Sequence, residues 1–247
     1  MIIKHVSKNE TNHYVALVDG KAYLIEGDIF GDYRVTDQEM DGTEIPFCAP
    51  SKIVALGLNY HKHAQEFGSN PAVEPLIFLK PTTSIIANGE PIVLPAVAQH
   101  VEFEGEIAIV VKDTCKNVPV ELAHQHVLGY TIANDVTERV LQKRDGQWTR
   151  AKGFDTFCPL SGVLQTELDL SNTLLTTCVN GVEKQRGNSA EMINNVHQAL
   201  AFVSSVMTLH AGDLILTGTP QGCSQIKSGD TVTVTVQNIG ALNNPVK

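Results

Sequence analysis

The sequence predicts a mixed, β-rich α+β fold, built as a strand sandwich or barrel and not as a doubly wound parallel sheet. Short, half-apolar segments bounded by glycine, proline or asparagine outnumber the segments with helical spacing. The helical segments are dispersed along the chain and do not alternate with the strands. Because a doubly wound sheet requires that alternation, a sandwich or barrel is favoured.

Length and charge narrow the range of partners. The chain has 247 residues, of which 43% are hydrophobic, enough for one large domain or one domain with an appendage. A formal net charge of -9 and the lack of a long basic run exclude nucleic acid as an expected partner. No apolar run approaches membrane length, and the first residues lack the apolar core of a signal peptide. We therefore expect a cytoplasmic protein with no membrane partner.

The cysteines predict neither disulfides nor a zinc site. Their number is odd, they are widely spaced, and no pair has CxxC spacing. Reduced, scattered thiols are the expectation for Cys48, Cys115, Cys158, Cys178 and Cys223.

Residues 1–47 are predicted to form a small N-terminal β subdomain. The segments "HYVALVDG" and "KAYLIEGDIF" are half-apolar, and the Asp19-Gly20 pair between them is typical of a hairpin turn. The prolines of "PFCAPSK" mark the connection to the remainder of the chain. Residues 48–247 are then predicted to form the larger domain.

Within 48–247, strands and helices follow one another irregularly. "KIVALGLNY" predicts a buried strand that ends at Gly57, and "HKHAQEFG" predicts a short helix that Gly68 ends. "VLGYTIANDV" predicts another strand, followed by a helix over "TERVLQKR". The segment 189–209 has helical apolar spacing, with Ser189 as its expected N-cap. "GDLILTGTP" and "GDTVTVTVQNIG" predict strands entered through Gly-Asp turns, the second half-buried because it alternates.

One predicted strand, "HVEFEGEIAIVV" (100–111), carries an acid at every second position. Glu102, Glu104 and Glu106 should project from one face, because strand side chains alternate. Burying three unpaired carboxylates is costly, so something positive should face them. The plain alternative is a sheet-edge strand with a solvated acidic face. Another isolated acid, Asp135, ends the apolar strand "TIAND", where its alternative role is the N-cap of the next helix.

Two glutamates and an aspartate are hard oxygen ligands, which suit Mg²⁺ or Mn²⁺ better than zinc or copper. Three carboxylates around a divalent ion leave one net negative charge, so an anionic substrate needs further cations. Arg139 follows Asp135 by four residues on the predicted helix, and Gln142 follows Arg139 by three. Lys152 lies downstream in "WTRAKGFD", where an ordinary surface lysine is the alternative.

The segments "GLNYHKHAQE", "VEFEGEIAIVV", "GYTIANDVTER", "QWTRAKGFDTFCP", "TGTPQG" and "GDTVTVTVQNIGALNNPV" together resemble the fumarylacetoacetate hydrolase family. The resemblance runs in order from about residue 52 to the carboxyl terminus, and is nearest to small bacterial acylpyruvases and 2-hydroxyhepta-2,4-diene-1,7-dioate isomerases. It implies a β-sandwich roll with a small N-terminal β subdomain, usually dimeric. It also implies a divalent ion, Mg²⁺ or Mn²⁺, held by Glu104, Glu106 and Asp135, with Glu102 beside them but not a ligand.

The resemblance assigns further roles. His63 and Glu66 match a general base and its orienting carboxylate on a mobile lid, although His61 is a competitor and a surface histidine is the alternative. The loop "FGSNPAVEP" after them is long and polar enough to move. Lys152 matches an active-site lysine, and the substrate-facing positions are Tyr60, Arg139, Gln142 and Thr219. In two departures, Leu58 replaces a common arginine, and Glu138, expected on the exposed side of its helix, replaces a small residue.

The implied function is a divalent-metal-dependent hydrolase that cleaves a C–C bond in 2,4-dioxo acids and releases pyruvate, with oxaloacetate decarboxylation as a further activity. The alternatives are an isomerase or decarboxylase of hydroxy-heptadienedioate-type acids in aromatic catabolism, an oxaloacetate keto–enol tautomerase, and a metabolite-binding protein without activity. The expected partners are a small 2-oxo (di)carboxylic acid and a second copy in a homodimer. Only 6% of the residues are aromatic, which favours small aliphatic acids.

Overall fold

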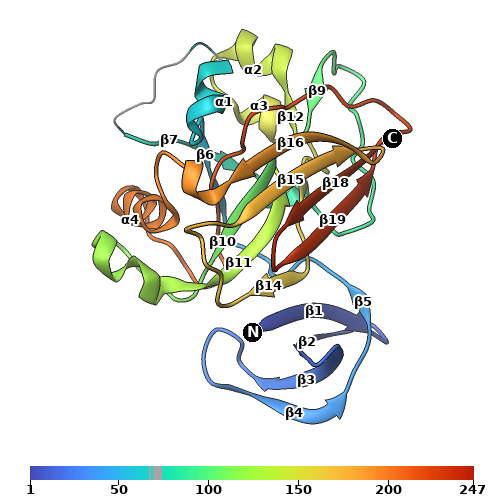
Figure 1. Cartoon of the computed structure of the whole chain (residues 1–247), viewed down its shortest axis with the longest axis vertical. Coiled ribbons are helices and arrows are strands. Elements are labelled where there is room, and N and C mark those ends of the chain that lie inside the picture. The colour runs from blue at the N-terminus through green and yellow to red at the C-terminus, as the bar shows by residue number, and fades with distance from the viewer. Residues whose placement is uncertain (67, 69–73) are drawn as a thin grey trace.

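The structure is a computed structural model, and it describes residues 1–66, 68 and 74–247. Among these residues, the largest element is a sheet of eleven strands (Figure 1). In sheet order its strands are β4 (Tyr33–Glu39), β3 (Lys21–Gly27), β2 (Thr11–Val18), β1 (Ile2–Lys8), β14 (Val163–Gln165), β11 (Val127–Asn134), β10 (Gly105–Val111), β17 (Leu214–Leu216), β6 (Ile53–Gly57) and β7 (Leu76–Lys80), with β5 (Thr43–Glu44) beside β1.

A second, four-stranded sheet packs on the middle of the large one. Its strands, in order, are β16 (Val182–Asn188), β15 (Leu174–Val179), β18 (Thr231–Val236) and β19 (Gly240–Pro245). Strands β15 and β18 contact β10 and β11. The predicted mixed, β-rich α+β fold with two packed sheets is confirmed, and β18 is half-buried as its alternation predicts.

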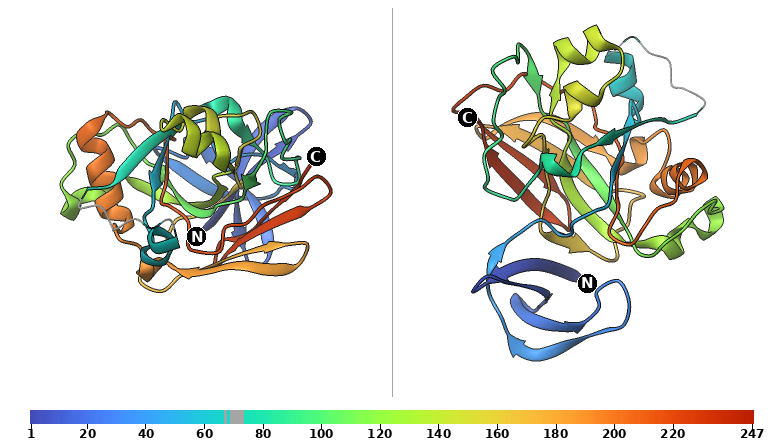
Figure 2. Two further views of the ribbon diagram at one scale, coloured as in Figure 1. Left: turned by 90° about the horizontal axis from the view of Figure 1, so that it is seen from above. Right: turned by 180° about the vertical axis from the view of Figure 1, so that it is seen from behind.

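The helices are few and lie around the sheets. Figures 1 and 2 show α1, α2 and α3 together at the end of the molecule opposite the N-terminal strands. The bounds are α1 (His61–Glu66), α2 (Arg139–Asp145), α3 (Thr149–Lys152), α4 (Val196–Val206), and the 3-10 turns η1 (Thr82–Ser84), η2 (Val120–His126) and η3 (Ser189–Glu191). Short strand pairs join β9 (Val101–Glu102) to β12 (Thr137–Glu138) and β8 (Ile85–Ile86) to β13 (Cys158–Pro159). No helix among the described residues is long and apolar enough to span a membrane.

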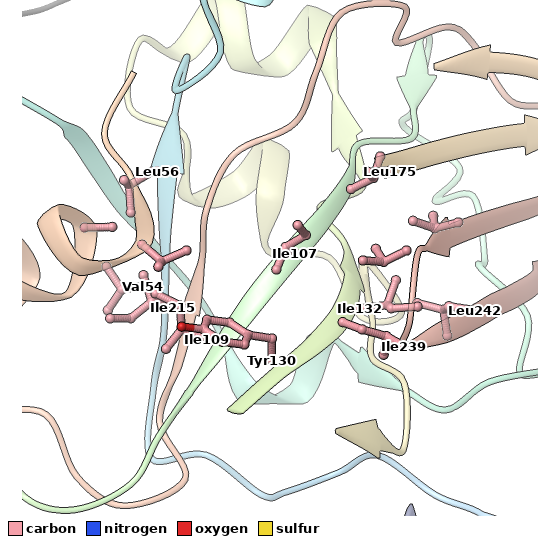
Figure 3. Close-up of a cluster of buried hydrophobic side chains, with 14 of the residues drawn as sticks. Val54, Leu56, Ile107, Ile109, Tyr130, Ile132, Leu175, Ile215, Ile239 and Leu242 are labelled. Carbon is pink, nitrogen blue, oxygen red and sulfur yellow. The ribbon is translucent and has the colours of Figure 1, made fainter. Parts of the chain in front are cut away.

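Strand β10 is buried on both faces, which explains its nearly continuous apolar sequence. Ile107 and Ile109 belong to the core between the two sheets, shown in Figure 3. Ala108 and Val110 belong to a second core on the opposite face. Fully burying an isoleucine or valine side chain contributes about 1.5–3 kcal/mol. The centre of the molecule is therefore a firmly held strand, and the site begins at its amino end.

The N-terminal strands continue the large sheet. The predicted hairpin forms between β2 and β3, and its turn residues Asp19 and Gly20 both have positive φ (49° and 80°), as a type I′ turn requires. Strand β1 pairs with β14 over three residues, whereas β14 pairs with β11 through Tyr130 and Gln165 alone. The division into 1–47 and 48–247 stays a prediction, since these pairings join both parts in one sheet.

The predicted strand 100–111 is wrong as a single element, because β9 and β10 are separated at residues 103 and 104. The backbone N–H of Glu104 donates to the side-chain oxygen of Asn134 (2.9 Å), so a side chain takes the place of a strand partner there. On the amino-terminal side of this break, β9 pairs with β12, and these two strands form a separate sheet from that of β10.

The predicted helix start at Ser189 and the alternative N-cap role of Asp135 are also wrong. Ser189 begins only η3, and its hydroxyl bonds to Leu170 and Thr173; the longer helix α4 starts after Asn195, whose side chain accepts two backbone N–H bonds. Asp135 does not cap α2, because Glu138 does so by accepting the N–H of Leu141. Glu138 is accordingly fully buried and not on the exposed side of its helix.

Candidate active site

The predicted acid triad comes together in space. Glu104 and Glu106 lie at the amino end of β10, Asp135 directly follows β11, and the pairing of Gly105 with Asn134 brings these ends side by side. One carboxylate oxygen from each acid lies within 4.8 Å of the other two, and all three residues are buried. Three converging carboxylates are a donor set suited to a divalent metal ion.

Three cations surround these carboxylates. The ammonium of Lys152 lies 2.6 Å from Glu104 Oε2 and 2.5 Å from Asp135 Oδ2. The guanidinium of Arg139 lies 2.5 Å from Glu104 Oε1, and Lys80 Nζ lies 2.7 Å from Asp135 Oδ1. Lys152 is buried, so the surface-lysine alternative is wrong. Lys80 was missed in the sequence, where the only signal was one lysine closing the apolar strand "LIFLK".

Glu106 is the acid whose charge these cations leave uncompensated. Among the described residues it makes no ion pair, and it accepts one hydrogen bond from the Gly218 N–H (2.6 Å). Burial, followed by Asp135 and Glu104, raises the pKa of Glu106 well above its ordinary value. Burial would also raise the pKa of Glu104, but Arg139 and Lys152 outweigh that effect and lower it. The ionised form of Glu106 is therefore disfavoured until a cation lies beside it, and a divalent ion held by the three acids would supply that cation, so the residues present fit such an ion.

His63 reaches the same cluster from α1. Its side chain is 4% exposed, so it is not a surface histidine, whereas His61 is exposed. His63 Nδ1 lies 3.4 Å from Glu66 Oε2, the contact that their i, i+3 spacing predicts. Burial lowers the pKa of His63, which favours the neutral imidazole. Most of the loop "FGSNPAVEP", predicted to move, lies outside the described residues.

Glu102 lies beside the triad and outside it. Its two carboxylate oxygens contact Arg139 Nε (2.6 Å) and His100 Nε2 (2.9 Å). Arg139 thus bridges Glu102 and Glu104, and its guanidinium also donates to Gln142 Oε1 (2.9 Å). These contacts fix the orientation of the guanidinium plane.

Thr219 and Tyr60, both predicted to face the substrate, differ in position. Thr219 lines the cavity, and its hydroxyl donates to the Gly105 carbonyl (2.8 Å). Tyr60 is fully buried in the core between the sheets and does not line the cavity. Its hydroxyl makes no hydrogen bond to any described residue, and a substrate-facing role for Tyr60 stays a prediction.

The site opens into a cavity of about 590 Å³. One wall is apolar: Leu58, held at a positive φ of 56°, and Trp148 both line it. The Trp148 ring packs so closely on Gly57 that a Cβ there would lie 2.7 Å from a ring carbon. Cys223, also missed in the sequence, brings its sulfur within 4.8 Å of ligand atoms of His63 and Glu104. The described lining residues are Leu56, Gly57, Leu58, His63, Glu66, His100, Glu102, Glu104, Glu106, Arg139, Gln142, Lys143, Trp148, Lys152 and Thr219.

Comparison with known proteins identifies the family. The model of the fumarylacetoacetate (FAA) hydrolase C-terminal domain matches residues 52–247. Among solved structures, 5-carboxymethyl-2-hydroxymuconate delta-isomerase from Mycobacterium smegmatis is 42% identical, with a TM-score of 0.92 over 100% of this chain and 99% of that one.

Two relatives with named activities are similar over most of their length. The oxaloacetate tautomerase YcgM of Escherichia coli is 40% identical over 192 residues, which is 75% of this chain and 88% of the relative. The mitochondrial oxaloacetate decarboxylase of Dictyostelium discoideum is 41% identical over 188 residues, 73% of this chain and 86% of the relative. The chain thus belongs to the fumarylacetoacetate hydrolase family.

Proposed function

We propose that the protein is a divalent-metal-dependent enzyme that converts small 2-oxo acids through their enol or enolate form, with oxaloacetate as its first candidate substrate. The observation that carries the proposal is the meeting of three buried carboxylates with Lys152, Arg139 and His63 beside one cavity, which all of them except Asp135 line. The oxaloacetate tautomerase and decarboxylase among the relatives support the choice of substrate.

Glu104, Glu106 and Asp135 would hold the ion, and their hard oxygens favour Mg²⁺ or Mn²⁺. When bound, the ion supplies a Lewis acid that stabilises negative charge on a 2-oxo oxygen. The raised pKa of Glu106 supports this assignment, because a buried carboxylate without a cation beside it is costly.

Arg139 and Lys152 would bind and orient the anionic substrate. Arg139 is oriented by Glu102 and Gln142, and a guanidinium held in one plane can bind a carboxylate through two parallel hydrogen bonds. Lys152 is more deeply buried, and its ammonium would stabilise the negative charge that develops on the enolate oxygen. Thr219 adds a hydroxyl at the cavity wall.

His63 would move the proton, with Glu66 orienting its ring. In tautomerisation of oxaloacetate, the neutral imidazole accepts a proton from C3 and returns it to the oxygen on C2. In decarboxylation, the C3–C4 bond breaks with loss of carbon dioxide, and the resulting enolate takes up one proton to give pyruvate.

Hydrolysis of a 2,4-dioxo acid is the second candidate, and the His63–Glu66 pair favours it. His63 would accept a proton from the water that attacks the C4 carbonyl. The C3–C4 bond then breaks, the C4 fragment leaves as a carboxylic acid, and the electron pair stays on C3 as the enolate of pyruvate. Water is consumed, so the reaction balances without another reactant.

The test uses metal-stripped protein with and without Mg²⁺. The absorbance of the enol is followed with oxaloacetate and with acetylpyruvate, and pyruvate is assayed at the end. Metal-dependent change of the oxaloacetate signal without pyruvate indicates tautomerisation, and with pyruvate it indicates decarboxylation. Loss of the acetylpyruvate signal with matching pyruvate indicates hydrolysis. If Mg²⁺ accelerates none of these reactions, the proposal is wrong for these substrates.

A homodimer also stays a prediction, which light scattering of the same preparation tests.

A further inference from the structure

A second group of side chains of the types that ligate metals lies at the opposite end of the β10–β11 pair. Asp113 and Cys115 follow β10, and His126 directly precedes β11. One ligand atom from each lies within 4.8 Å of the other two. We propose that Asp113, Cys115 and His126 form a second metal site, selective for a borderline ion such as Zn²⁺ and independent of the proposed function.

The donor set carries the choice of ion. It offers one sulfur, one nitrogen and one oxygen, a combination that Zn²⁺ and Co²⁺ accept and that Mg²⁺ does not. A thiolate and a carboxylate together carry two negative charges and a neutral imidazole carries none, so a divalent ion would leave this site neutral without further cations. With three protein ligands, a tetrahedral ion keeps one position for water or an external ligand.

Cys115 is the independent observation that points to a ligand. It is only 6% exposed, and its thiol makes no hydrogen bond to any residue that the structure describes. Its backbone is fixed on both sides, because its N–H donates to the Leu209 carbonyl (3.0 Å) and its carbonyl accepts the Leu209 N–H (2.9 Å). The backbone that carries this sulfur is thus fixed close to the two other ligands.

Asp113 and His126 form the entrance to the site. Their side chains are 47% and 26% exposed, and Asp113 Oδ1 lies 2.5 Å from His126 Nδ1. That contact requires a proton between the two atoms, and an entering ion would replace it. The backbone bond from Lys112 N–H to the His126 carbonyl (2.8 Å) keeps both chain segments together. An ion arriving from solvent would therefore meet Asp113 and His126 before it meets the buried thiol.

The main experiment reads sulfur ligation directly. Reduced, metal-stripped protein is titrated with Co²⁺ while excess Mg²⁺ fills the carboxylate triad, and absorbance is recorded in the near ultraviolet. A thiolate-to-cobalt charge-transfer band is expected in the wild type and in Asp135→Ala, and its loss is expected in Cys115→Ser. Cys223→Ser is the matched cysteine control, since Cys223 lies near His63 and Glu104. A wild type without the band, or a band lost in Cys223→Ser and kept in Cys115→Ser, overturns the proposal.

A second measurement guards against misfolding of Cys115→Ser. In competition with a chromogenic chelator, His126→Ala should weaken Zn²⁺ binding by at least about tenfold. His124→Ala is its control, because His124 lies in the same turn and its ring faces His197 instead. Zn²⁺ at 100 times its dissociation constant should raise the thermal midpoint of the wild type by roughly 5–10 °C. Equal Zn²⁺ affinity in the wild type and His126→Ala would overturn the site.

Discussion

Side chains of the types that ligate metals lie at both ends of the β10–β11 pair, but the two groups differ in burial and in the charges around them. At one end three carboxylates are buried, and Lys80, Lys152 and Arg139 surround them. At the other, roughly 20 Å away over the seven residues of β10, an acid and a histidine are partly exposed above a thiol. The same strands thus present a hard, charge-rich site and a mixed-donor site. Burial decides the difference, because only the buried end needs cations to balance its charge.

The largest expected effect is at the buried end. Asp135→Ala removes one ligand of the proposed triad and the partner of two lysines, so metal-dependent turnover should fall by at least about a hundredfold. Turnover measured at increasing Mg²⁺ concentrations gives this loss. The control is Asp113→Ala, which removes an acid at the other end of the β10–β11 pair. If Asp113→Ala lowers turnover as much, the two ends are not independent.

His63→Ala should lower the rates of hydrolysis and of decarboxylation by different factors. Without the imidazole, hydrolysis of acetylpyruvate should fall by about 10²–10⁴-fold, because water needs a base. Decarboxylation of oxaloacetate should fall less, since no water attacks. Rates for both substrates are compared in one preparation, with His61→Ala as the exposed control. Equal losses in both reactions would argue against His63 as the base that activates water.

Lys80→Met tests whether cations hold the buried end together. Breaking a buried ion pair by removing one partner costs about 3–5 kcal/mol, and Asp135 keeps Lys152 as a partner, so the lower part of that range is expected. The loss should shrink when Mg²⁺ is present, because the ion takes over part of the balancing charge. Urea unfolding with and without Mg²⁺ measures it. Lys62→Met removes an exposed ion pair with Glu191 and should cost at most about 1 kcal/mol.

The smallest expected effect concerns a carboxylate near the other end. Asp213 is buried and accepts hydrogen bonds from Ser51, Lys52 and His210. Burial would raise the pKa of Asp213, but these bonds and the Lys52 ion pair outweigh it and lower the pKa. The unfolded chain therefore binds the proton more readily than the native one. The stabilisation by Asp213 should be complete at pH 7 and decline as pH falls below about 4.

Asp213→Asn is the variant that checks this sign. The difference in free energy of unfolding between wild type and variant should be larger at pH 7 than at pH 3. Urea unfolding at both values gives the difference. A gap that widens on acidification would mean that the carboxylate is not the stabilising form.

The sequence predicted the acids of the site better than their neighbours. Glu104, Glu106 and Asp135 stand out because acids interrupt otherwise apolar strands, a signal visible in the chain itself. Lys80 is the last residue of β7, a position where a solvent-exposed lysine is equally common. Its burial and its pairing with Asp135 depend on the packing of α3 against β7, which the sequence does not show.

The wrong predictions have the same cause. Glu138 caps α2 and also accepts the N–H groups of Gln99 and His100, which lie far away in sequence. Ser189 and Asn195 are both good capping residues, and the contacts of the Ser189 hydroxyl outside the segment decided between them. Patterns along the chain predict side-chain type and strand position, whereas contacts between distant segments set burial and partners.

The short pairing between β14 and β11 has a consequence for the local unfolding of the molecule. Strand β14 has three residues and pairs with β11 through a single residue pair, and just before β14 the Ser161 N–H donates to the Ile132 carbonyl (2.9 Å). Few backbone hydrogen bonds therefore link the first four strands to the centre of the sheet. These strands can therefore exchange their amide hydrogens through local opening, while β10 and β11 exchange only when the whole molecule unfolds. Such an opening would uncover the face of β10 that carries Ala108 and Val110, because Ile3 and Ala16 share a core with them.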